Sequence, residues 1–283
     1  MTRSFRMFGE MLPESPVVLS VPHAGRDYPA TLRMALRAPL ASLAALEDRH
    51  VDAIALAARA HETLLLQTLP RAWIDLNRAE HERDPLLDEG ACRGAGASAK
   101  VRAGIGLVPR RTAAAGELWR CRLSAAEVEA RIAADHRPYH ETLAQVLAAA
   151  RARFGCAVLL DVHSMPPIAG GRARLVIGDR FGRAAAARFV ARVEEALGRE
   201  GLHHLLNTPY AGGHILERHA APQIGIHAIQ LEIDRALYLD RRLDQPGAGA
   251  AATVRMLRAV IDALTEQALS EGAEAPPIAD AAE

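Results

Sequence analysis

An apolar run, Cys156-Ala157-Val158-Leu159-Leu160-Asp161-Val162-His163-Ser164-Met165-Pro166, stops abruptly at polar side chains and a proline. This pattern predicts a buried strand that ends in a turn, and ligands bind at that edge of open α/β sheets. Asp161 and His163 are two residues apart, so on a strand their side chains point to the same side. A carboxylate beside an imidazole can fix the tautomer of the ring and leave its other nitrogen free for a metal ion or a proton.

A second apolar run ends in the same way, at Val17-Val18-Leu19-Ser20-Val21-Pro22-His23-Ala24-Gly25. It delivers another histidine, His23, to the end of a predicted strand. A single histidine of this kind is more often structural than functional. Two such strand ends in one chain favour a functional site that includes His23 and His163.

A third segment, Ile226-His227-Ala228-Ile229-Gln230-Leu231-Glu232-Ile233-Asp234-Arg235, predicts another buried strand that Glu232 interrupts. An ionised carboxylate is costly there unless it is paired, bound to a metal ion or catalytic. The structural alternative is a salt bridge from Glu232 to a nearby arginine. Gln230 and Asp234 share the face of Glu232 on the strand, so either is the alternative to Glu232 as a catalytic group.

A fourth segment, Arg71-Ala72-Trp73-Ile74-Asp75-Leu76-Asn77-Arg78, puts two guanidinium groups and an amide around a predicted short strand. Arginine binds a carboxylate through two parallel hydrogen bonds, so this pattern suits a site for an acidic substrate. The structural alternative is a surface network of arginines, which are abundant in this chain.

Length and composition indicate one domain. The chain has 283 residues, half of them hydrophobic, which is enough for one large α/β domain or two small ones. No linker rich in Pro, Gly or Ser divides it, and the candidate residues come from both halves. We therefore expect a single domain over residues 1–270 and a disordered tail over residues 271–283, where two prolines lie among small and acidic residues.

Charge and apolar patterning argue against several classes of function. Lys+Arg and Asp+Glu number 34 each, which gives no reason to expect binding to nucleic acid or to an anionic membrane. Residues 1–10 lack the apolar core of a signal peptide, and no apolar stretch is long enough to span a bilayer, so we expect a soluble, cytoplasmic protein. Cys92, Cys121 and Cys156 form no Cys-x-x-Cys pair and indicate reduced thiols.

Helical and strand patterns alternate along the chain, which predicts an α/β sandwich with a largely parallel or mixed sheet. In the first half of the chain we expect a helical region over 41–62, on or near which Glu47 and Asp48 lie, and short strands at 63–68 and 73–76. Further along we expect a long helix from Ser124 toward Phe154, a strand near 174–177, and helices at about 183–199 and 249–269. The glycine-rich segment 86–109 has neither periodicity nor a dinucleotide fingerprint. A mobile loop over the site and a plain surface excursion both suit that segment.

Eight short motifs follow one another in an order that resembles a known family. They are Val21-Pro22-His23-Ala24-Gly25, Glu47-Asp48-Arg49-His50-Val51-Asp52, Ile74-Asp75-Leu76-Asn77-Arg78, Pro138-Tyr139-His140, Asp161-Val162-His163-Ser164-Met165-Pro166, Ile177-Gly178-Asp179-Arg180-Phe181-Gly182, Asn207-Thr208-Pro209-Tyr210-Ala211-Gly212-Gly213 and Gln230-Leu231-Glu232-Ile233-Asp234-Arg235-Ala236-Leu237-Tyr238. Together they resemble the N-formylglutamate amidohydrolases, a family similar in fold and site to zinc carboxypeptidases and aspartoacylases. The resemblance implies a three-layer α/β sandwich with the central mixed sheet of the zinc-peptidase (phosphorylase/hydrolase-like) type.

The resemblance implies a zinc ion or a similar divalent metal, with His23 and His163 among its ligands. Catalytic zinc commonly takes three protein ligands and leaves a fourth position for water. The related peptidases place a glutamate three residues after the first histidine, but here Arg26 stands there and cannot bind a cation. Asp48 matches the carboxylate of the family's second motif and is the expected third ligand, with its neighbour Glu47 as the alternative.

The resemblance also implies roles in catalysis and substrate binding. Glu232 corresponds to the base that takes a proton from water and returns it to the departing nitrogen. Arg71 corresponds to the arginine that stabilises the oxyanion. Asn77 and Arg78 match the pair that binds the α-carboxylate of the substrate.

Supporting roles fall to a further set of residues. Asp161 and His140 are expected to support the site or to position the substrate. The second carboxylate of a glutamate substrate needs another cation, for which Arg235, Arg172 and Arg180 are the candidates.

The expected activity is therefore metal-dependent hydrolysis of the formamide bond of N-formyl-L-glutamate to formate and L-glutamate, a step in histidine breakdown. The same groups would suit another small acidic N-acyl amino acid, or a carboxypeptidase-like enzyme. A metal-dependent binding or regulatory protein that retains the fold is the alternative of a different class, and it would need neither Glu232 nor an open metal position. The sequence does not fix the oligomeric state.

Overall fold

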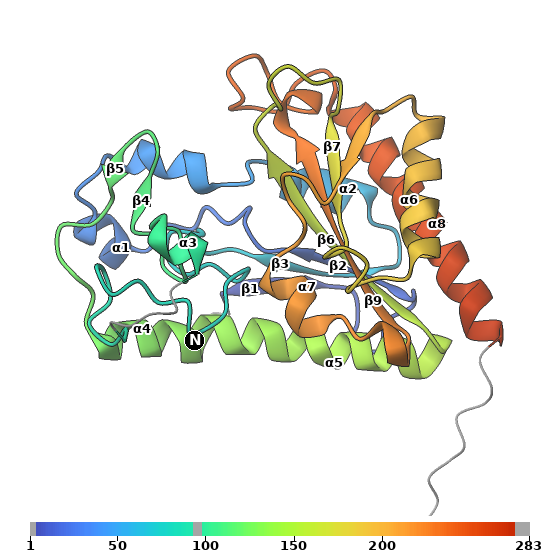
Figure 1. Cartoon of the computed structure of the whole chain (residues 1–283), viewed down its shortest axis with the longest axis horizontal. Helices are drawn as coiled ribbons and strands as arrows, with labels where there is room; N and C mark the ends of the chain where they lie inside the picture. The colour runs from blue at the N-terminus through green and yellow to red at the C-terminus, as the bar shows by residue number, and fades with distance from the viewer. Residues whose placement is uncertain (1–3, 93–97, 275–283) are drawn as a thin grey trace, which may run out of the picture.

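The computed structural model describes residues 4–92 and 98–274, and within them seven strands form one mixed sheet (Figure 1). Across the sheet the strands are β1 (Phe5–Phe8), β3 (Thr63–Gln67), β2 (Val17–Val21), β6 (Ala157–Met165), β9 (Ile226–Asp234), β7 (Leu175–Gly178) and β8 (His204–Leu206). The four central strands β3, β2, β6 and β9 are parallel to one another. β1 runs antiparallel to β3 at one edge, and β7, which is parallel to β8, runs antiparallel to β9. The expected mixed α/β architecture is confirmed.

Helices cover both faces of the sheet and produce three layers. One face packs against α2 (Val51–Ala58), α6 (Ala187–Arg199) and α8 (Ala250–Glu274), and the other against α5 (Arg137–Phe154) and α7 (His214–His219). Strand alternation explains this division. On β6, Val158 and Leu160 point into the α8 layer, whereas Ala157 and Leu159 point into the α5 layer.

The face that packs against α5 changes character along the strands. The face is apolar near the amino ends of the strands, whereas polar side chains occupy it toward the carboxyl ends of β2, β6 and β9, three of the four parallel strands. These side chains, all buried, are Ser20, Asp161, His163, Gln230 and Glu232. Their strands are in register, with Ser20 opposite Asp161 and His163 opposite Glu232. The sheet therefore gathers polar groups at its carboxyl edge, where ligands bind in open α/β sheets.

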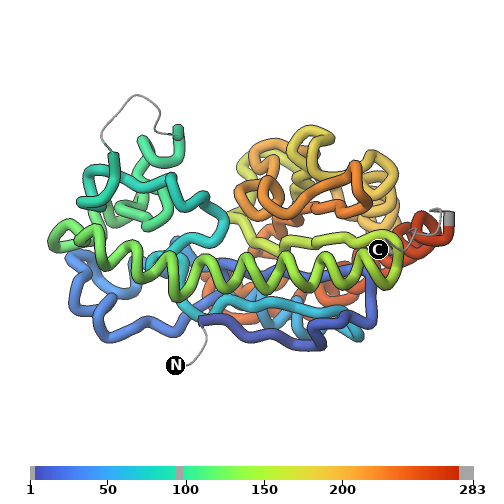
Figure 2. The backbone as a smooth tube through the Cα atoms, turned by 90° about the horizontal axis from the view of Figure 1, so that it is seen from below, coloured from blue at the N-terminus to red at the C-terminus, as the bar shows by residue number. Residues whose placement is uncertain are grey.

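The long helix predicted from Ser124 is present but is interrupted by a wider turn. Ser124 Oγ accepts a hydrogen bond from the Glu127 N–H and caps α4 (Ala125–Arg131). The chain continues through a π-helical turn, Ile132–His136, into α5. Figure 2 shows this helix running beneath both residues 75–92 and 98–120 (teal) and the segment around residues 180–220 (yellow to orange). The helix therefore lies against two parts of the chain that are distant in sequence.

Three sequence predictions need correction. Residues 73–76 form turns instead of a strand, because the Trp73 N–H closes a turn onto the Pro70 carbonyl. The region 41–62 is split between the 3-10 helix η1 (Leu40–Leu46) and α2, so that Glu47 and Asp48 lie in the link between them.

The third correction concerns the expected disordered tail. Residues 271–274 belong to α8, since Glu271 pairs with Arg188 and Gly272 lies against the carbonyl of Phe154 too closely for any side chain. The rest of that tail, residues 275–283, lies outside the described residues, and so do residues 93–97 of the glycine-rich segment. The single-domain boundary at residue 270 stays a prediction.

Short elements complete the chain. They are α1 (Ala30–Ala35), α3 (Ala99–Arg102), a hairpin of β4 (Arg111–Thr112) and β5 (Gly116–Glu117), and the 3-10 turns η3 (Pro222–Ile224) and η4 (Arg235–Leu237). α3 gives part of the glycine-rich segment a regular structure that the sequence did not predict. None of the helices in the described part of the chain combines the length and apolar character needed to cross a membrane.

Candidate active site

Three residues expected to bind a metal ion meet at the carboxyl edge of the sheet, and we call them the metal group: His23, Asp48 and His163. His163 lies on β6, His23 follows β2, and Asp48 precedes α2. Asp48 Oδ2 is 3.1 Å from His163 Nδ1 and 3.6 Å from His23 Nδ1. All three side chains are buried, and the Asp48 N–H donates to the His23 carbonyl over 3.0 Å, which fixes the carboxylate beside the first ring.

The spacing of the metal group suits a divalent cation. Ligands about 2.0–2.1 Å from a tetrahedral zinc ion stand roughly 3.3 Å from one another. The two distances from Asp48 to the histidines lie on either side of that value, and the potential ligand atoms all lie within 4.8 Å of one another. Two imidazoles and one carboxylate form a donor set that zinc accepts.

A buried carboxylate holds each ring of the metal group from behind. His23 Nε2 lies 2.7 Å from Asp75 Oδ1, and His163 Nε2 lies 2.7 Å from Asp161 Oδ2. Because a carboxylate only accepts, each Nε2 carries a proton, and each Nδ1 faces Asp48. Carboxylate–histidine pairs of this kind set the tautomer and orientation of metal-binding rings.

The charges around the metal group attract a proton or a metal ion. Burial opposes the charged form of His163, but Asp161 and Asp48 overcome it and raise the pKa of that imidazole well above its usual value. Burial also opposes the charged form of Asp48, yet hydrogen bonds with His163 and His23 hold the pKa of Asp48 well below its usual value. A cation bound between these side chains would take the place of the protons that they otherwise share.

Asp75 connects the metal group to Arg71. Arg71 Nε donates to Asp75 Oδ2 over 2.8 Å, while Asp75 Oδ1 faces His23 and also accepts from the Asn77 N–H. Burial lowers the pKa of Arg71, but the negative charges of Asp75, Asp48 and Glu232 outweigh it and raise that pKa. The guanidinium thus lies in the field of the metal group, where an oxyanion would form.

Asp75 lies within one of the eight motifs, but no role for it was predicted from the sequence. Its signal was a carboxylate inside an otherwise apolar stretch, the same signal that singled out Glu232. The backbone N–H of Asp75 donates a hydrogen bond to the carbonyl of Leu107, which lies in the glycine-rich segment, and this bond holds Asp75 in place. That segment therefore supports the site through its backbone.

Glu232 stands opposite His163 in the register of β6 and β9. Its carboxylate accepts a hydrogen bond from Gln230 Nε2 over 3.0 Å, and it forms no ion pair with any of the described residues. Burial raises the pKa of Glu232 to about 7, although the charge of His163 opposes that effect. The arginine salt bridge that would explain a buried Glu232 structurally is thus absent from the described part of the chain.

The two neighbours of Glu232 on its strand face have other partners. Asp234 pairs with Arg174, with 2.7 Å between Oδ2 and Nε, and it caps η4 through the Ala236 N–H. Gln230 lies between Asn77 and Glu232 and accepts from Asn77 Nδ2 over 3.3 Å. Glu232 is therefore the better candidate for a base at this edge.

Asn77 and Arg78 lie beside the metal group but are partly engaged by the protein. Asn77 Oδ1 accepts from the Ile215 N–H over 2.9 Å and thereby ties α7 to the site. Arg78 Nε donates to the Ile105 carbonyl and its Nη1 to the Asn77 carbonyl, at 2.9 and 2.7 Å. Arg78 Nη2 makes no hydrogen bond to the described residues and is the atom available to a carboxylate.

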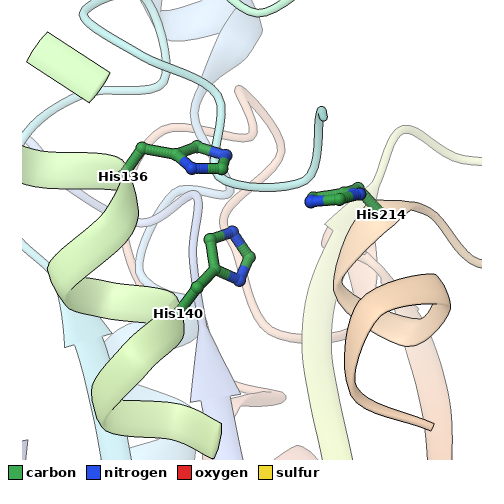
Figure 3. A group of neighbouring side chains, drawn as sticks. All are labelled: His136, His140 and His214. Atoms are coloured by element: carbon green, nitrogen blue, oxygen red, sulfur yellow. The ribbon is translucent and has the colours of Figure 1, made fainter. Parts of the chain in front are cut away.

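A second group of histidines lies behind this segment, and we call it the latch group: His136, His140 and His214 (Figure 3). His136 ends the π-helical turn and His140 lies one turn further along the helix, while His214 begins α7. His140 Nε2 donates to the Leu76 carbonyl over 3.0 Å, and His136 Nε2 donates to the Arg78 carbonyl over 2.8 Å. The two rings thus hold the backbone on either side of Asn77.

This placement gives His140 a supporting position. It has no exposed surface, and both ring nitrogens are taken, since its Nδ1 lies 2.9 Å from Nε2 of His219. Of the two roles expected for His140, support of the site agrees with these contacts, whereas binding of the substrate does not, because the buried ring has no free nitrogen. Sequence reasoning missed His136, whose role depends on the wider turn that the sequence did not predict.

Arg235 and Glu47 also differ from the simplest expectation. Arg235 Nη2 donates to the Glu47 carbonyl over 2.6 Å and lies 3.3 Å from Asp48 Oδ1, so Arg235 orients the metal group. The Glu47 carboxylate faces Tyr28 and Arg49 and lies outside the metal group. Asp48, and not Glu47, is thus the carboxylate beside the two histidines.

Tyr210 also lies in one of the eight motifs, and no role for it was predicted from the sequence. It lies in the segment between β8 and α7 and is partly buried. Burial raises the pKa of its phenol; the charges of Glu232 and Asp48 raise it further, and those of Arg235 and Arg71 oppose the increase. The phenol therefore lies among the charges of the site.

A third set of possible metal ligands has properties that disfavour a metal ion. Cys156, His227 and Glu271 lie together on the α8 side of the sheet. Burial raises the pKa of the Cys156 thiol to about 12, and Glu271 is paired with Arg188. A protonated thiol and a neutralised carboxylate are poor ligands.

An open pocket of about 300 Å³ lies next to Asn77 and Arg78. Its lining also includes Lys100 from α3, Arg180 and Arg183 from the turn after β7, and His214 from α7. Of the three arginines considered for a second substrate carboxylate, only Arg180 lines this pocket. Arg172 is exposed elsewhere, and Arg235 contacts Asp48.

Comparison with known proteins identifies the family. Residues 15–239 match the N-formylglutamate amidohydrolase family. An N-formylglutamate deformylase of Pseudomonas putida is 28% identical over 268 residues, which cover 92% of this chain and 94% of that protein. An N-formylglutamate deformylase of Pseudomonas aeruginosa is 36% identical over 143 residues. This match covers 48% of this chain and 53%, about half, of the length of that relative.

Solved structures show the same fold. The crystal structure of N-formylglutamate amidohydrolase from Ralstonia eutropha JMP134 superimposes on this protein with a TM-score of 0.85 at 32% identity. The superposition covers 94% of this chain and 99% of the Ralstonia chain. A gene product of Agrobacterium tumefaciens shares the fold with a TM-score of 0.66 at 20% identity, with 96% and 97% of the two chains covered. Because the family match extends over most of the chain, this protein belongs to the N-formylglutamate amidohydrolase family.

Proposed function

We propose that this protein hydrolyses the formamide bond of N-formyl-L-glutamate to formate and L-glutamate, with a divalent metal ion, zinc fitting best, bound by His23, Asp48 and His163. The observation that carries the proposal is the pairing of two features at one sheet edge. One is a metal group backed by carboxylates, and the other is an unpaired glutamate, Glu232, directly opposite His163. A binding protein has no need of the second feature.

The metal group would hold the ion that supplies electrophilic chemistry. A divalent ion bound there would polarise the formyl carbonyl and lower the pKa of a water molecule. Asp75 and Asp161 hold the two rings in the orientation that this requires. Arg235 holds the other oxygen of Asp48 and keeps that carboxylate turned toward the rings.

Glu232 performs the proton transfers. Its carboxylate takes a proton from the attacking water as the oxygen bonds to the formyl carbon. It then returns that proton to the nitrogen as the carbon–nitrogen bond breaks, so that formate and the free amino acid leave. With burial raising its pKa to about 7, Glu232 is suited both to accept and to donate a proton near neutral pH.

Arg71 and Arg78 stabilise negative charge at two places. Arg71, held by Asp75, faces the developing oxyanion, where a fixed positive charge lowers the energy of the transition state. Arg78 presents Nη2 to the α-carboxylate of the substrate, and Asn77 holds the neighbouring backbone in place. The latch group fixes the carbonyls on both sides of Asn77 and so keeps this binding segment rigid.

The proposal is tested by formate release from matched N-formyl and N-acetyl amino acids, with and without a chelator. We expect fastest turnover of N-formyl-L-glutamate, loss of activity with the chelator and recovery when zinc is added back. Full activity in the chelator would rule out the metal. Faster turnover of N-acetyl or neutral substrates would replace N-formylglutamate with another N-acyl amino acid.

A further inference from the structure

We propose that Arg180 is the residue that selects an acidic side chain in the substrate, by binding its carboxylate in the pocket beside Asn77 and Arg78. This inference rests on the proposed function and adds a second anion site to it. The α-carboxylate binds at Arg78, and the side chain of the substrate extends into the pocket toward Arg180. Sequence reasoning left three arginines open for this contact, and the structure places one of them in the pocket.

The first observation is an unsatisfied guanidinium. Arg180 Nη2 donates to Glu217 over 2.8 Å, but its Nη1 is buried and has no hydrogen-bond partner in the described part of the chain. A buried donor without a partner is costly, and a charged one more so. A carboxylate in the pocket would supply the missing acceptor through a charge-assisted hydrogen bond.

The second observation is the backbone that carries this arginine. Arg180 and Phe181 both adopt left-handed conformations, each with φ of 57°, which non-glycine residues seldom do. Asn207 holds the turn, because its Oδ1 accepts from the Asp179 and Phe181 N–H groups at 3.1 and 3.2 Å. The Arg180 N–H in turn donates to the Ala211 carbonyl over 2.8 Å. Two strained residues held in this way are typical of a functional turn.

The third observation is the balance of charge in the pocket. Its lining carries four cations, Arg78, Lys100, Arg180 and Arg183, against two carboxylates. One carboxylate, Glu217, is already bound to Arg180, and the other, Glu82, is bound by the Ala79 N–H and by Ser98 Oγ. The lining therefore keeps an excess of positive charge for a small anion.

A neutral hydrogen-bond donor, the ring of His214, also lines the pocket. Both ring nitrogens of His214 are without a hydrogen-bond partner among the described residues, and His214 lines the same pocket. Burial lowers the pKa of His214 to about 4, so at neutral pH the ring is uncharged and offers one N–H. The absence of a side chain at Gly213 lets this part of α7 approach Asn77, since a Cβ there would lie 2.4 Å from Asn77 Oδ1. The pocket is thus held directly against the α-carboxylate site.

The test compares a dianionic with a monoanionic substrate. For Arg180→Gln, kcat/KM for N-formyl-L-glutamate should fall on the order of 10- to 100-fold, the effect of losing one charged hydrogen bond. The value for N-formyl-L-glutamine should change less than about threefold. Arg180→Lys, which keeps the charge but loses the fork, should lie between Arg180→Gln and the wild type. Arg172→Gln removes an exposed arginine outside the pocket and serves as the matched control with unchanged values for both substrates.

Equal losses on both substrates, or no loss on either, would overturn the role of Arg180. If Arg180→Gln does not fold, as judged by circular dichroism, Arg180→Lys carries the comparison alone. Calorimetric binding of L-glutamate and L-glutamine separates this proposal from the proposed function. A preference for L-glutamate that disappears in the Arg180 variant supports the pocket even if no formate is released, and the lack of any preference in the wild type contradicts it.

Discussion

The metal group and the latch group each contain at least two buried histidines, yet they differ in what lies behind those rings. Carboxylates back both rings of the metal group. Backbone carbonyls back His136 and His140 in the latch group. A carboxylate stabilises positive charge on the imidazole or on an ion bound to it, whereas a carbonyl only accepts a hydrogen bond from the N–H that the neutral ring already carries.

The pKa values show the consequence of that difference. Neighbouring carboxylates raise the pKa of His163 in spite of burial, whereas burial lowers the pKa of His140 well below its usual value. The metal group therefore attracts cations, and the latch group stays neutral and orders the backbone. Three clustered histidines alone do not make a metal site, and their outer partners decide what they do.

The largest expected effect separates the two groups by metal content. His163→Ala should lose both stoichiometric metal and activity, because the remaining pair of ligands holds zinc weakly. His136→Ala, the control from the latch group, should keep one equivalent of metal. Elemental analysis of the purified variants, with circular dichroism to confirm folding, makes the measurement. Stoichiometric metal in His163→Ala would contradict the assignment of the metal group.

The next effect isolates catalysis from binding at the metal group. Glu232→Gln keeps the shape of the side chain but removes the base, so kcat should fall roughly 10²-fold or more while metal content stays the same. Asp234→Asn on the same strand face should change kcat only a few-fold, since Asp234 pairs with Arg174. Near wild-type turnover in Glu232→Gln would remove the proposed mechanism.

A smaller effect tests whether the outer carboxylates matter as the comparison requires. Asp75→Asn should weaken metal affinity about 10- to 100-fold, the usual cost of losing a carboxylate behind a metal-binding histidine. Asp84→Asn removes another buried acid, one that pairs with Arg110, and should leave the affinity unchanged. Competition with a metal-sensitive chelating dye measures both values. An unchanged affinity in Asp75→Asn would show that the ring of His23 needs no carboxylate.

The smallest expected effect concerns stability around the latch group. Burial lowers the pKa of His219, which contacts His140, to about 3 in the folded protein, whereas an unfolded histidine titrates near 6.5. Between these values the unfolded chain binds more protons, so the free energy of unfolding falls as pH falls, by at most about 1.4 kcal/mol per pH unit for one ring. His219→Gln should reduce this slope in urea unfolding at pH 7, 6 and 5. Equal slopes for both proteins would show that His219 titrates normally.

The sequence predicted those parts of the site that lie on regular strands. His23, His163 and Glu232 each stand in or directly after an apolar run, and parallel strands bring such ends together. The family resemblance identified Asp48, whose position depends on a short link between two helices that periodicity does not define. The expectations for β2, β3, β6, β7 and β9 were correct for the same reason, since apolar runs mark these strands, whereas the strand expected at residues 73–76 is absent.

The roles of side chains that irregular backbone positions could not be predicted from the sequence. Asp75 reaches His23 only because its turn bonds to Leu107, 32 residues further along the chain. His136 reaches the Arg78 carbonyl from a π-helical turn, which no local pattern indicated. Arg180 could not be selected among three arginines, because the pocket that favours it combines residues from near 77, 100, 180 and 214.

Location of the metal ion itself tests the central claim most directly. Crystals grown with zinc and measured on both sides of the zinc absorption edge would give an anomalous signal at each bound ion. We predict one strong peak, within about 2.0–2.2 Å of Nδ1 of His23, Nδ1 of His163 and a carboxylate oxygen of Asp48, and no peak in the latch group. A peak among His136, His140 and His214, with none in the metal group, would contradict the account.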